Sequence, residues 1–378
     1  MNFLFACGGT GGHINPAVAA AQRIRTLLPD AGILFVGARN NMEMDLVLRE
    51  GFPIRGISVS NLHRSLKPGE VAHNLRSALL LEKGLREAGR ILREFRPDAV
   101  LGTGGYVCYP VLRAAAARGI PTLLHEANAR PGLTTRMLEK HADRLMVAFE
   151  ESRGGYRHPE RILTVGMPVR AGFRETERAE ARAGFGLDGR PFLLSFGGSL
   201  GAEKLNAAMA ELIAENERTG AFRLLHAVGG GEEGVRRMEA LLAEKGVTRP
   251  QYAVLRPYIY DMPAAMAASD LILCRAGAST LGELCAVGRA AVLVPYPYAT
   301  GNHQEKNARL LEKAGGACVL PDGELSGERL GALVRELLRD PARLRQMGAA
   351  LKELDRPDCL DLMVGEAFRL AGEKTKGL

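Results

Sequence analysis

Short apolar runs alternate with longer amphipathic stretches along the whole chain. Runs of this kind are typical of parallel strands buried on both faces, and the stretches between them predict the helices of β-α-β units. The expected strands are 3–6, 33–36, 54–59, 99–101, 122–125 and 145–148 in the first half, and 192–196, 224–228, 253–255, 271–274 and 291–295 in the second. The pattern predicts an α/β protein with two doubly wound, Rossmann-like domains that face each other across a cleft.

A polar stretch separates the two halves. Residues 151–160 are poor in helix formers, and Gly166-Met167-Pro168-Val169-Arg170 follows them as a linker would. A length of 378 residues also fits two domains better than one. We expect domains at 1–166 and 167–356, and a helix within 357–378 that returns to the first domain.

Three glycine-rich turns follow expected strands, at 8–12, 102–105 and 197–201. Two of them, in the segments 5–12 and 194–201, begin the two halves in the same way. Such a turn brings backbone N–H groups and a helix N-terminus together, where a phosphate binds well. A single turn is equally a tight connection that needs positive φ. Three turns at one edge of parallel sheets favour a ligand site.

Several nucleotide motifs are absent. Gly9-Thr10-Gly11-Gly12-His13-Ile14 lacks the third glycine of a dinucleotide fingerprint, and 37–40 supplies no acidic residue. The chain has no P-loop and no G-x-S-x-G nucleophile elbow. These absences argue against NAD, against triphosphate transfer and against serine hydrolase chemistry.

Two segments of the second half carry the positive indications. Residues 274–283 run from a strand into a helix, and Glu283 is placed two turns in, where a carboxylate can accept both hydroxyls of a ribose. The N–H groups of 278–280 can face a diphosphate or a sugar. His303 and Gln304 begin another helix and can bond sugar hydroxyls. The alternatives are a solvated Glu283 and simple helix capping by His303 and Gln304.

The amino-acid composition limits the classes of molecule that the protein is expected to bind. Fifty basic and 43 acidic residues give a net charge of +7, which suits phosphate-bearing substrates, an anionic membrane surface or nucleic acid. Tryptophan is absent and aromatics are 5% of the chain, which argues against nucleic acid. The six cysteines are far apart, with no spacing of metal ligands, and no apolar run is long enough to span a bilayer. We expect a reducing cytoplasm and no metal or other cofactor.

Taken together, the motifs of the chain resemble those of glycosyltransferase family 28, whose GT-B enzymes add N-acetylglucosamine from UDP-N-acetylglucosamine to lipid I in peptidoglycan synthesis. The matching segments are GGTGGHINPA (8–17), VLGTGGYVCYP (100–110), LLHEANARPGLT (123–134), GMPVR (166–170), FGGSLGA (196–202), CRAGASTLGE (274–283) and HQEKNA (303–308). They lie in order along nearly the whole chain. The resemblance implies an inverting transfer to the C4 hydroxyl of the lipid-linked muramyl sugar, forming lipid II and UDP.

The resemblance also implies a role for each matching residue. The donor sugar and diphosphate would lie near Thr10, Gly11, Gly12 and Asn128, and the diphosphate would contact Arg170 and Ser199. Ile259 would contact the uracil and Glu283 the ribose. The N-acetylglucosamine would contact Ala278, Ser279, Thr280, His303 and Gln304, and Leu281 and Gly282 would also bind the substrate. Gly104, Gly105 and Tyr106 would form an acceptor or diphosphate loop. His13 would be the general base, with a structural role as the alternative. The chain has no D-x-D pair at a place where a divalent metal would be expected, so we expect the transfer to be independent of metal.

A lipid-linked acceptor requires contact with the membrane, and 64–96 offers a surface for it. At about 100° per residue, one broad stripe faces the core and consists of Leu80, Leu81, Leu85, Ala88, Ile91, Leu92 and Phe95. The opposite side carries Val71, Leu75 and Leu79, among the cations Arg76, Lys83, Arg86, Arg90 and Arg93. An apolar patch with cations around it suits a peripheral contact with the anionic cytoplasmic face of the cell membrane. The alternative is that Gly84 breaks the helix and both stripes are core.

Three other functions remain open from the sequence. The first is another GT-B glycosyltransferase that acts on a membrane lipid. The second is a UDP-N-acetylglucosamine 2-epimerase, against which the segments 125–132 and 166–170 argue. The third is a sugar-nucleotide-binding protein without catalysis.

Overall fold

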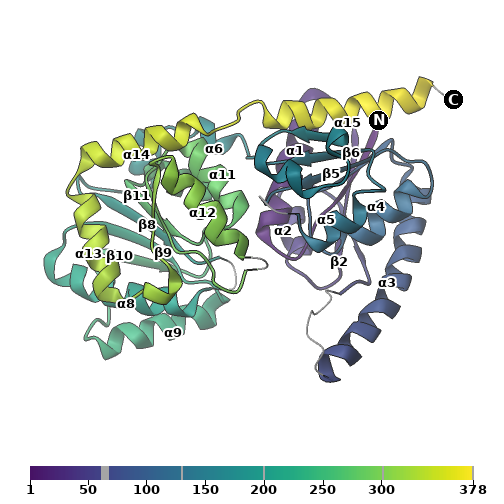
Figure 1. Cartoon of the computed structure of the whole chain (residues 1–378). Coiled ribbons are helices and arrows are strands. Elements are labelled where there is room, and N and C mark those ends of the chain that lie inside the picture. The colour runs from purple at the N-terminus through teal and green to yellow at the C-terminus, as the bar shows by residue number, and fades with distance from the viewer. Residues whose placement is uncertain (61–67, 129–130, 199–200, 300–301, 377–378) are drawn as a thin grey trace. The chain divides into compact units, whose positions relative to one another are not determined.

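The chain forms two compact units in a computed structural model, which describes residues 1–60, 68–128, 131–198, 201–299 and 302–376 (Figure 1). Of residues 68–76, 78, 151 and 373–376, the side chains also lie outside the described part. The first unit comprises Met1–Arg170 and Arg356–Leu378, and the second comprises Ala171–Asp355.

A seven-stranded parallel sheet forms the centre of the first unit, in the order β3-β2-β1-β4-β5-β6-β7. Its strands are β1 (Asn2–Ala6), β2 (Gly32–Ala38), β3 (Ile54–Ile57), β4 (Ala99–Gly102), β5 (Thr122–Glu126), β6 (Arg144–Val147) and β7 (Ile162–Thr164). The strand order reverses between β1 and β4, which pair in parallel. In open α/β sheets the carboxyl edge at such a point is where ligands bind.

Helices cover both faces of this sheet. The helices are α1 (Gly11–Leu27), α2 (Glu43–Arg49), α3 (Pro68–Phe95), α4 (Cys108–Ala116), α5 (Leu133–Leu138) and α15 (Cys359–Lys376), with 3-10 turns at Glu150–Gly155 and Pro159–Arg161. Alternate strand residues face opposite sides: Phe3 and Phe5 are buried with α1 and α15, and Leu4 and Ala6 with α3 and α4. This accounts for the continuous apolar runs of the strands.

The last helix, α15, packs on the first unit, as the sequence predicts. The rings of Phe3 and Phe368 lie 5.5 Å apart. Arg23 Nε donates to Asp361 Oδ1 at 2.6 Å, so that α15 is paired with α1. Two further basic residues, Arg144 and Arg369, bond the Glu366 carboxylate.

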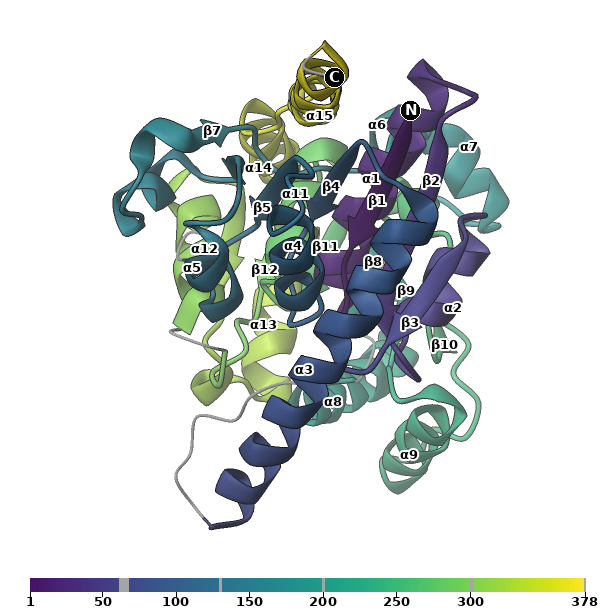
Figure 2. The same ribbon diagram turned by 90° about the vertical axis from the view of Figure 1, so that its right-hand side faces the viewer.

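The long helix α3 is continuous through Gly84, so the alternative in which this glycine breaks the helix is wrong. A Cβ atom at Gly84 would lie 2.7 Å from the carbonyl oxygen of Ser58, so the glycine permits close packing. The N-terminal part of α3 extends away from the sheet (Figures 1 and 2). Ala88, Ile91 and Leu92 are buried, as the first stripe predicts.

The second unit repeats the architecture with a six-stranded parallel sheet, in the order β10-β9-β8-β11-β12-β13. Its strands are β8 (Phe192–Phe196), β9 (Arg223–Ala227), β10 (Ala253–Arg256), β11 (Leu271–Cys274), β12 (Ala291–Leu293) and β13 (Ala317–Val319). Its helices are α6 (Gly172–Glu175), α7 (Arg178–Gly184), α8 (Glu203–Thr219), α9 (Gly231–Glu244), α10 (Met262–Ala268), α11 (Ala278–Val287), α12 (His303–Lys313), α13 (Gly327–Leu338) and α14 (Pro341–Glu353), with a 3-10 turn at Asp322–Glu324. The order reverses between β8 and β11.

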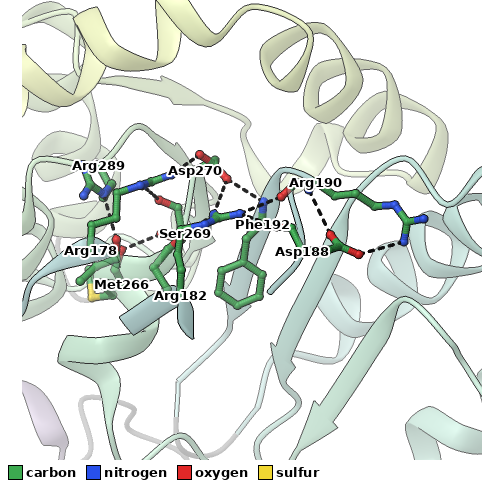
Figure 3. A network of polar contacts seen from close by, with 11 residues as sticks. Arg178, Arg182, Asp188, Arg190, Phe192, Met266, Ser269, Asp270 and Arg289 are labelled. Carbon is green, nitrogen blue, oxygen red and sulfur yellow. Dashed lines mark hydrogen bonds and ion pairs between the residues drawn. The ribbon is translucent and has the colours of Figure 1, made fainter. Parts of the chain in front are cut away.

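A polar network fixes the opposite, amino-terminal edge of the second sheet (Figure 3). Asp270 accepts bonds from Arg178 and Arg182 of α7, and its Oδ2 also accepts the N–H of Phe192 at 2.8 Å. Arg289 lies in the same network, where burial and the charge of Arg178 lower its pKa. One carboxylate thus ties α7 to the starts of β8 and β11.

The α/β class and the doubly wound parallel sheets are confirmed, and each predicted strand is present. The structure adds β7 and β13, which the sequence pattern did not predict. In the described residues, no helix is both long and apolar enough to cross a membrane.

Candidate functional site

The first glycine turn connects β1 to α1. His13 N–H and Ile14 N–H both bond the carbonyl oxygen of Thr10, at 3.0 and 3.2 Å. The N–H groups of Thr10, Gly11 and Gly12 make no hydrogen bond within the described part of the chain. Since these donors stand at the N-terminus of a long helix, they suit an anion or an electron-rich oxygen.

The second glycine turn follows β4 and packs directly against the first. A Cβ atom at Gly104 would lie 2.4 Å from Nδ1 of His13, and one at Gly105 would lie 2.3 Å from the carbonyl oxygen of Gly8. The Gly104 N–H bonds Cys108 Sγ at 3.3 Å. The glycines of this turn therefore serve close approach between two loops.

His13 is fixed by Thr103 on the second turn. His13 Nδ1 lies 3.2 Å from the carbonyl oxygen of Thr103, and the Thr103 hydroxyl donates to the carbonyl oxygen of His13 at 2.6 Å. A carbonyl oxygen only accepts, so Nδ1 carries the hydrogen and Nε2 keeps its lone pair. The geometry thus makes Nε2 the atom of His13 that can take up a proton.

Tyr106 and Asn128 are held by polar neighbours. Asn41 donates its amide to the Tyr106 hydroxyl. Asn128 donates through both its backbone N–H and its side-chain amide to Glu126 Oε1, at 3.0 and 2.9 Å. Glu126 Oε2 also accepts the Thr135 hydroxyl at 2.6 Å. A buried carboxylate at the end of β5 therefore organises the loop that carries Asn128.

Arg170 ends the first unit and is engaged within it. Its Nη1 donates to Glu50 Oε1 at 2.9 Å, and Glu50 Oε2 accepts from Gln22 at 2.9 Å. The Arg170 side chain is about one-fifth exposed. A diphosphate would therefore share Arg170 with Glu50 or displace that carboxylate.

The start of α11 supplies a second set of N–H donors. The Leu281 N–H bonds the carbonyl oxygen of Gly277 at 3.0 Å, whereas the N–H groups of Ala278, Ser279 and Thr280 bond no acceptor in the described residues. Glu283 is 7% exposed on the same helix, so it is not an ordinary solvated residue.

The other residues expected at the donor site follow β10 or stand in the first turn of α12. Ile259 is buried, and the rings of its sequence neighbours Tyr258 and Tyr260 lie 4.9 Å apart. Gln304 Oε1 accepts the Tyr296 N–H at 2.9 Å, and His303 stands half-buried at the first turn of α12. The expected contact residue Ser199 lies outside the described residues.

Thus the described residues gather, within each unit, at the carboxyl ends of the strands. In the first unit these are Thr10, Gly11, Gly12, His13, Gly104, Gly105, Tyr106 and Asn128; in the second they are Ile259, Ala278, Ser279, Thr280, Leu281, Gly282, Glu283, His303 and Gln304. Arg170 is not among them, because its partner Glu50 follows the end of α2 and bonds Gln22 in the later part of α1. Both groups include the switch points, β1/β4 and β8/β11. No group of three or more potential metal ligands occurs among the described residues.

Sequence reasoning missed the residues that support these loops. Glu43 accepts the Gly9 N–H, and Glu126 orders the loop of Asn128. Arg275 Nη1 bonds Asp322 and the carbonyl oxygens of Val294 and Pro295, which fixes the turn after β12. The contacts of Glu43 and Arg275 join residues that are distant in sequence, whereas Glu126 lies two residues from Asn128.

Comparison with known proteins identifies relatives along the full chain. Residues 3–147 match the glycosyltransferase family 28 N-terminal domain, and residues 192–363 match the glycosyltransferase family 28 C-terminal domain. The chain is 44% identical to the UDP-N-acetylglucosamine–N-acetylmuramyl-(pentapeptide) pyrophosphoryl-undecaprenol N-acetylglucosamine transferase of Desulforudis audaxviator, with 100% of both chains covered. The protein with the same name from Desulforamulus reducens is 40% identical, over 95% of this chain and 96% of the relative.

Solved structures agree with the fold. The crystal structure of Acinetobacter baumannii MurG has a TM-score of 0.70 and 28% identity, covering 97% of this chain and 99% of that one. The UDP-GlcNAc 2-epimerase of Neisseria meningitidis, bound to UDP-GlcNAc, has a TM-score of 0.69 at 12% identity, covering 98% of this chain and 100% of that one. At that identity the second likeness concerns the fold alone.

Proposed function

The chain belongs to glycosyltransferase family 28, and from this premise we propose that it transfers N-acetylglucosamine from UDP-N-acetylglucosamine to lipid I, forming lipid II and UDP. The names of its full-length relatives state this donor and an undecaprenol-linked muramyl acceptor. The structural observation that carries the proposal is at the β8/β11 switch point, where the open N–H groups of 278–280 and the buried Glu283 stand on one helix.

The second unit holds the donor in this proposal. The N–H groups of Ala278, Ser279 and Thr280 face the diphosphate or sugar, and Glu283 accepts the ribose hydroxyls. Ile259 packs on the uracil, and the N-acetylglucosamine contacts Leu281, Gly282, His303 and Gln304, with Ser199 on the diphosphate. The near-complete burial of Glu283 supports its role, because a buried carboxylate on this helix is held in place and is not an ordinary solvated side chain.

The first unit completes the reaction centre in this proposal. The open N–H groups of Thr10, Gly11 and Gly12 stabilise the negative charge that grows on the leaving UDP, with Asn128 beside them and Arg170 on the diphosphate. Gly104, Gly105 and Tyr106 face the acceptor. The packing of the two glycine turns supports this arrangement, because it places donors and His13 on one edge of the sheet.

The chemical step is an inverting displacement. The C4 hydroxyl oxygen of the muramyl sugar attacks C1 of N-acetylglucosamine from the side opposite the diphosphate, and the bond from C1 to the diphosphate oxygen breaks. Nε2 of His13 takes the hydroxyl proton, and UDP leaves with the bonding electrons. The bond of Nδ1 to Thr103 supports this assignment, since it leaves Nε2 as the acceptor.

Membrane contact is the remaining part of the proposal. Leu79 is 75% exposed on α3 and Lys83 is exposed one turn later, so this stripe is not core at Leu79. The side chains of Val71, Leu75 and Arg76 lie outside the described residues. An apolar residue beside a cation suits a peripheral contact with the anionic cytoplasmic face of the cell membrane.

The test is release of UDP from UDP-N-acetylglucosamine, measured with and without a synthetic lipid I acceptor. We expect release only with the acceptor, together with a product heavier than the acceptor by one N-acetylglucosamine unit. Turnover of the donor without acceptor would indicate an epimerase or hydrolase, and binding without turnover would indicate a binding protein. A screen of donors and lipid acceptors separates lipid I from another membrane lipid.

A further inference from the structure

Glu43, the first residue of α2, is a fully buried carboxylate that bridges two loops of the first unit. Its side chain is 0% exposed. Oε1 accepts the Ala38 N–H at 2.9 Å, and Oε2 accepts the Gly9 N–H at 3.2 Å. Within the described residues no lysine, arginine or histidine pairs with it. Burying a carboxylate without a cation is costly, so these N–H bonds are what stabilise it.

The backbone around Glu43 leaves room for this carboxylate. A Cβ atom at Gly8 would lie 2.4 Å from Glu43 Oε1, and one at Gly37 would lie 2.5 Å from Glu43 Cγ. A side chain at either position would therefore move Glu43. The two glycines and the carboxylate form one packed unit beneath the β1–α1 turn.

This arrangement divides the N–H groups of the turn. The Gly9 N–H points to Glu43, whereas those of Thr10, Gly11 and Gly12 bond nothing in the described part of the chain. We propose that Glu43 is a positioning residue: it holds Gly9 and thereby aims the next three N–H groups at the charge that develops on the substrate. This inference rests on the proposed function.

The same carboxylate also acts on the second glycine turn. Burial raises the pKa of the Tyr106 phenol, against the hydrogen bond from Asn41, and the negative charge of Glu43 raises it further. Glu43 thus lies within electrostatic reach of both turns that line this edge of the sheet.

The variant Glu43→Gln tests the role with little change of shape. A glutamine oxygen can accept one of the two N–H groups, but its amide nitrogen faces the other as a second donor. We expect the Gly9 amide to exchange its hydrogen at least about ten-fold faster in hydrogen exchange resolved to single amides. We expect kcat to fall about ten- to one-hundred-fold, with the Kd for UDP within about two-fold, because the second unit holds the nucleotide.

Asp143→Asn is the matched control, since Asp143 accepts the Thr122 N–H at 2.8 Å at the start of β5. At an equal loss of Tm, this control should keep kcat within about two-fold of wild type. If both variants lose kcat in proportion to Tm, or if Gly9 exchange is unchanged in Glu43→Gln, the inference is overturned.

A second variant serves if Glu43→Gln does not fold. Gly8→Ala displaces the same carboxylate from the other side and should give the same faster exchange at Gly9 and the same loss of kcat. Normal exchange and kcat in Gly8→Ala would contradict the inference. If the wild-type protein transfers no sugar, the proposed function fails, whereas the exchange of Gly9 still decides whether Glu43 positions the turn.

Discussion

Nδ1 of His13 lies 3.2 Å from the carbonyl oxygen of Thr103, and the Thr103 hydroxyl returns a bond of 2.6 Å to the carbonyl oxygen of His13. These two bonds lock the first turn of α1 to the end of β4. They also favour the tautomer of the imidazole that carries its hydrogen on Nδ1. The predictions about His13 and its neighbours follow from this pairing.

Replacing His13 should remove the proton acceptor. We expect His13→Ala to lower kcat about one-hundred- to ten-thousand-fold in the acceptor-dependent assay, with little change in UDP binding. His158→Ala is the control, because that imidazole is nearly half exposed on a surface turn. A His13→Ala enzyme with near-normal kcat would assign His13 a structural role.

Gly104→Ala should displace His13 without altering its chemistry. Gly104 has φ +112°, and its new Cβ atom would stand 2.4 Å from His13 Nδ1. We expect kcat to fall about one-hundred-fold, as a misplacement of about 1 Å can cause. Gly119→Ala is the control, since Gly119 has φ +63° and nothing lies within 4 Å of its Cβ position.

The Gly119→Ala control separates the effect of backbone strain from that of the collision between the new Cβ atom at residue 104 and His13. Gly119→Ala should lose about 1 to 2 kcal/mol of stability and keep its kcat. If Gly104→Ala loses only the same stability and retains kcat, the contact between the two turns has no part in catalysis.

Leu79 should contribute to membrane binding. We expect Leu79→Glu to weaken binding to vesicles that contain anionic phospholipid about ten-fold. The charged glutamate would not insert into the membrane as the exposed leucine does in this proposal. Leu48→Glu, a change of the same type at a 57% exposed residue of α2, should bind as wild type does. Equal vesicle binding by all three proteins would exclude this face of α3 as the contact.

Docking of α15 should depend on pH through Glu366. Hydrogen bonds from Arg369, and then from Arg144, lower its pKa to about 2, against the opposing effect of burial. Because the pKa is lower in the folded state, this stabilisation is complete above the ordinary glutamate range and is lost as the pH falls toward 2. The difference in unfolding free energy between wild type and Glu366→Gln should therefore shrink below about pH 4.5. A constant difference across this range would contradict the pairing.

Much of the fold was predictable because the signals are local. Buried parallel strands give continuous apolar runs, and glycine turns mark the carboxyl ends of β1, β4 and β8. The strands β7 and β13 were missed, although β12, which is also three residues long, was predicted. The sequence left open whether Gly84 breaks the helix, since only the structure shows that this glycine accommodates the carbonyl oxygen of Ser58.

The candidate site was predictable in its exposed parts and not in its supports. The N–H groups of 278–280 and Glu283 follow from a strand, a turn and a helix that are contiguous in sequence. Glu43 lies 34 residues from the Gly9 N–H that it accepts. A bond between such distant residues depends on the pairing of β1 with β2, which no local pattern specifies.

The central claim is that the start of α11 holds UDP, and a crystal structure with UDP bound tests it most directly. We expect the diphosphate within hydrogen-bond distance of the N–H groups of 278–280, the ribose hydroxyls on Glu283 and the uracil against Ile259. A nucleotide bound away from these residues would contradict the account.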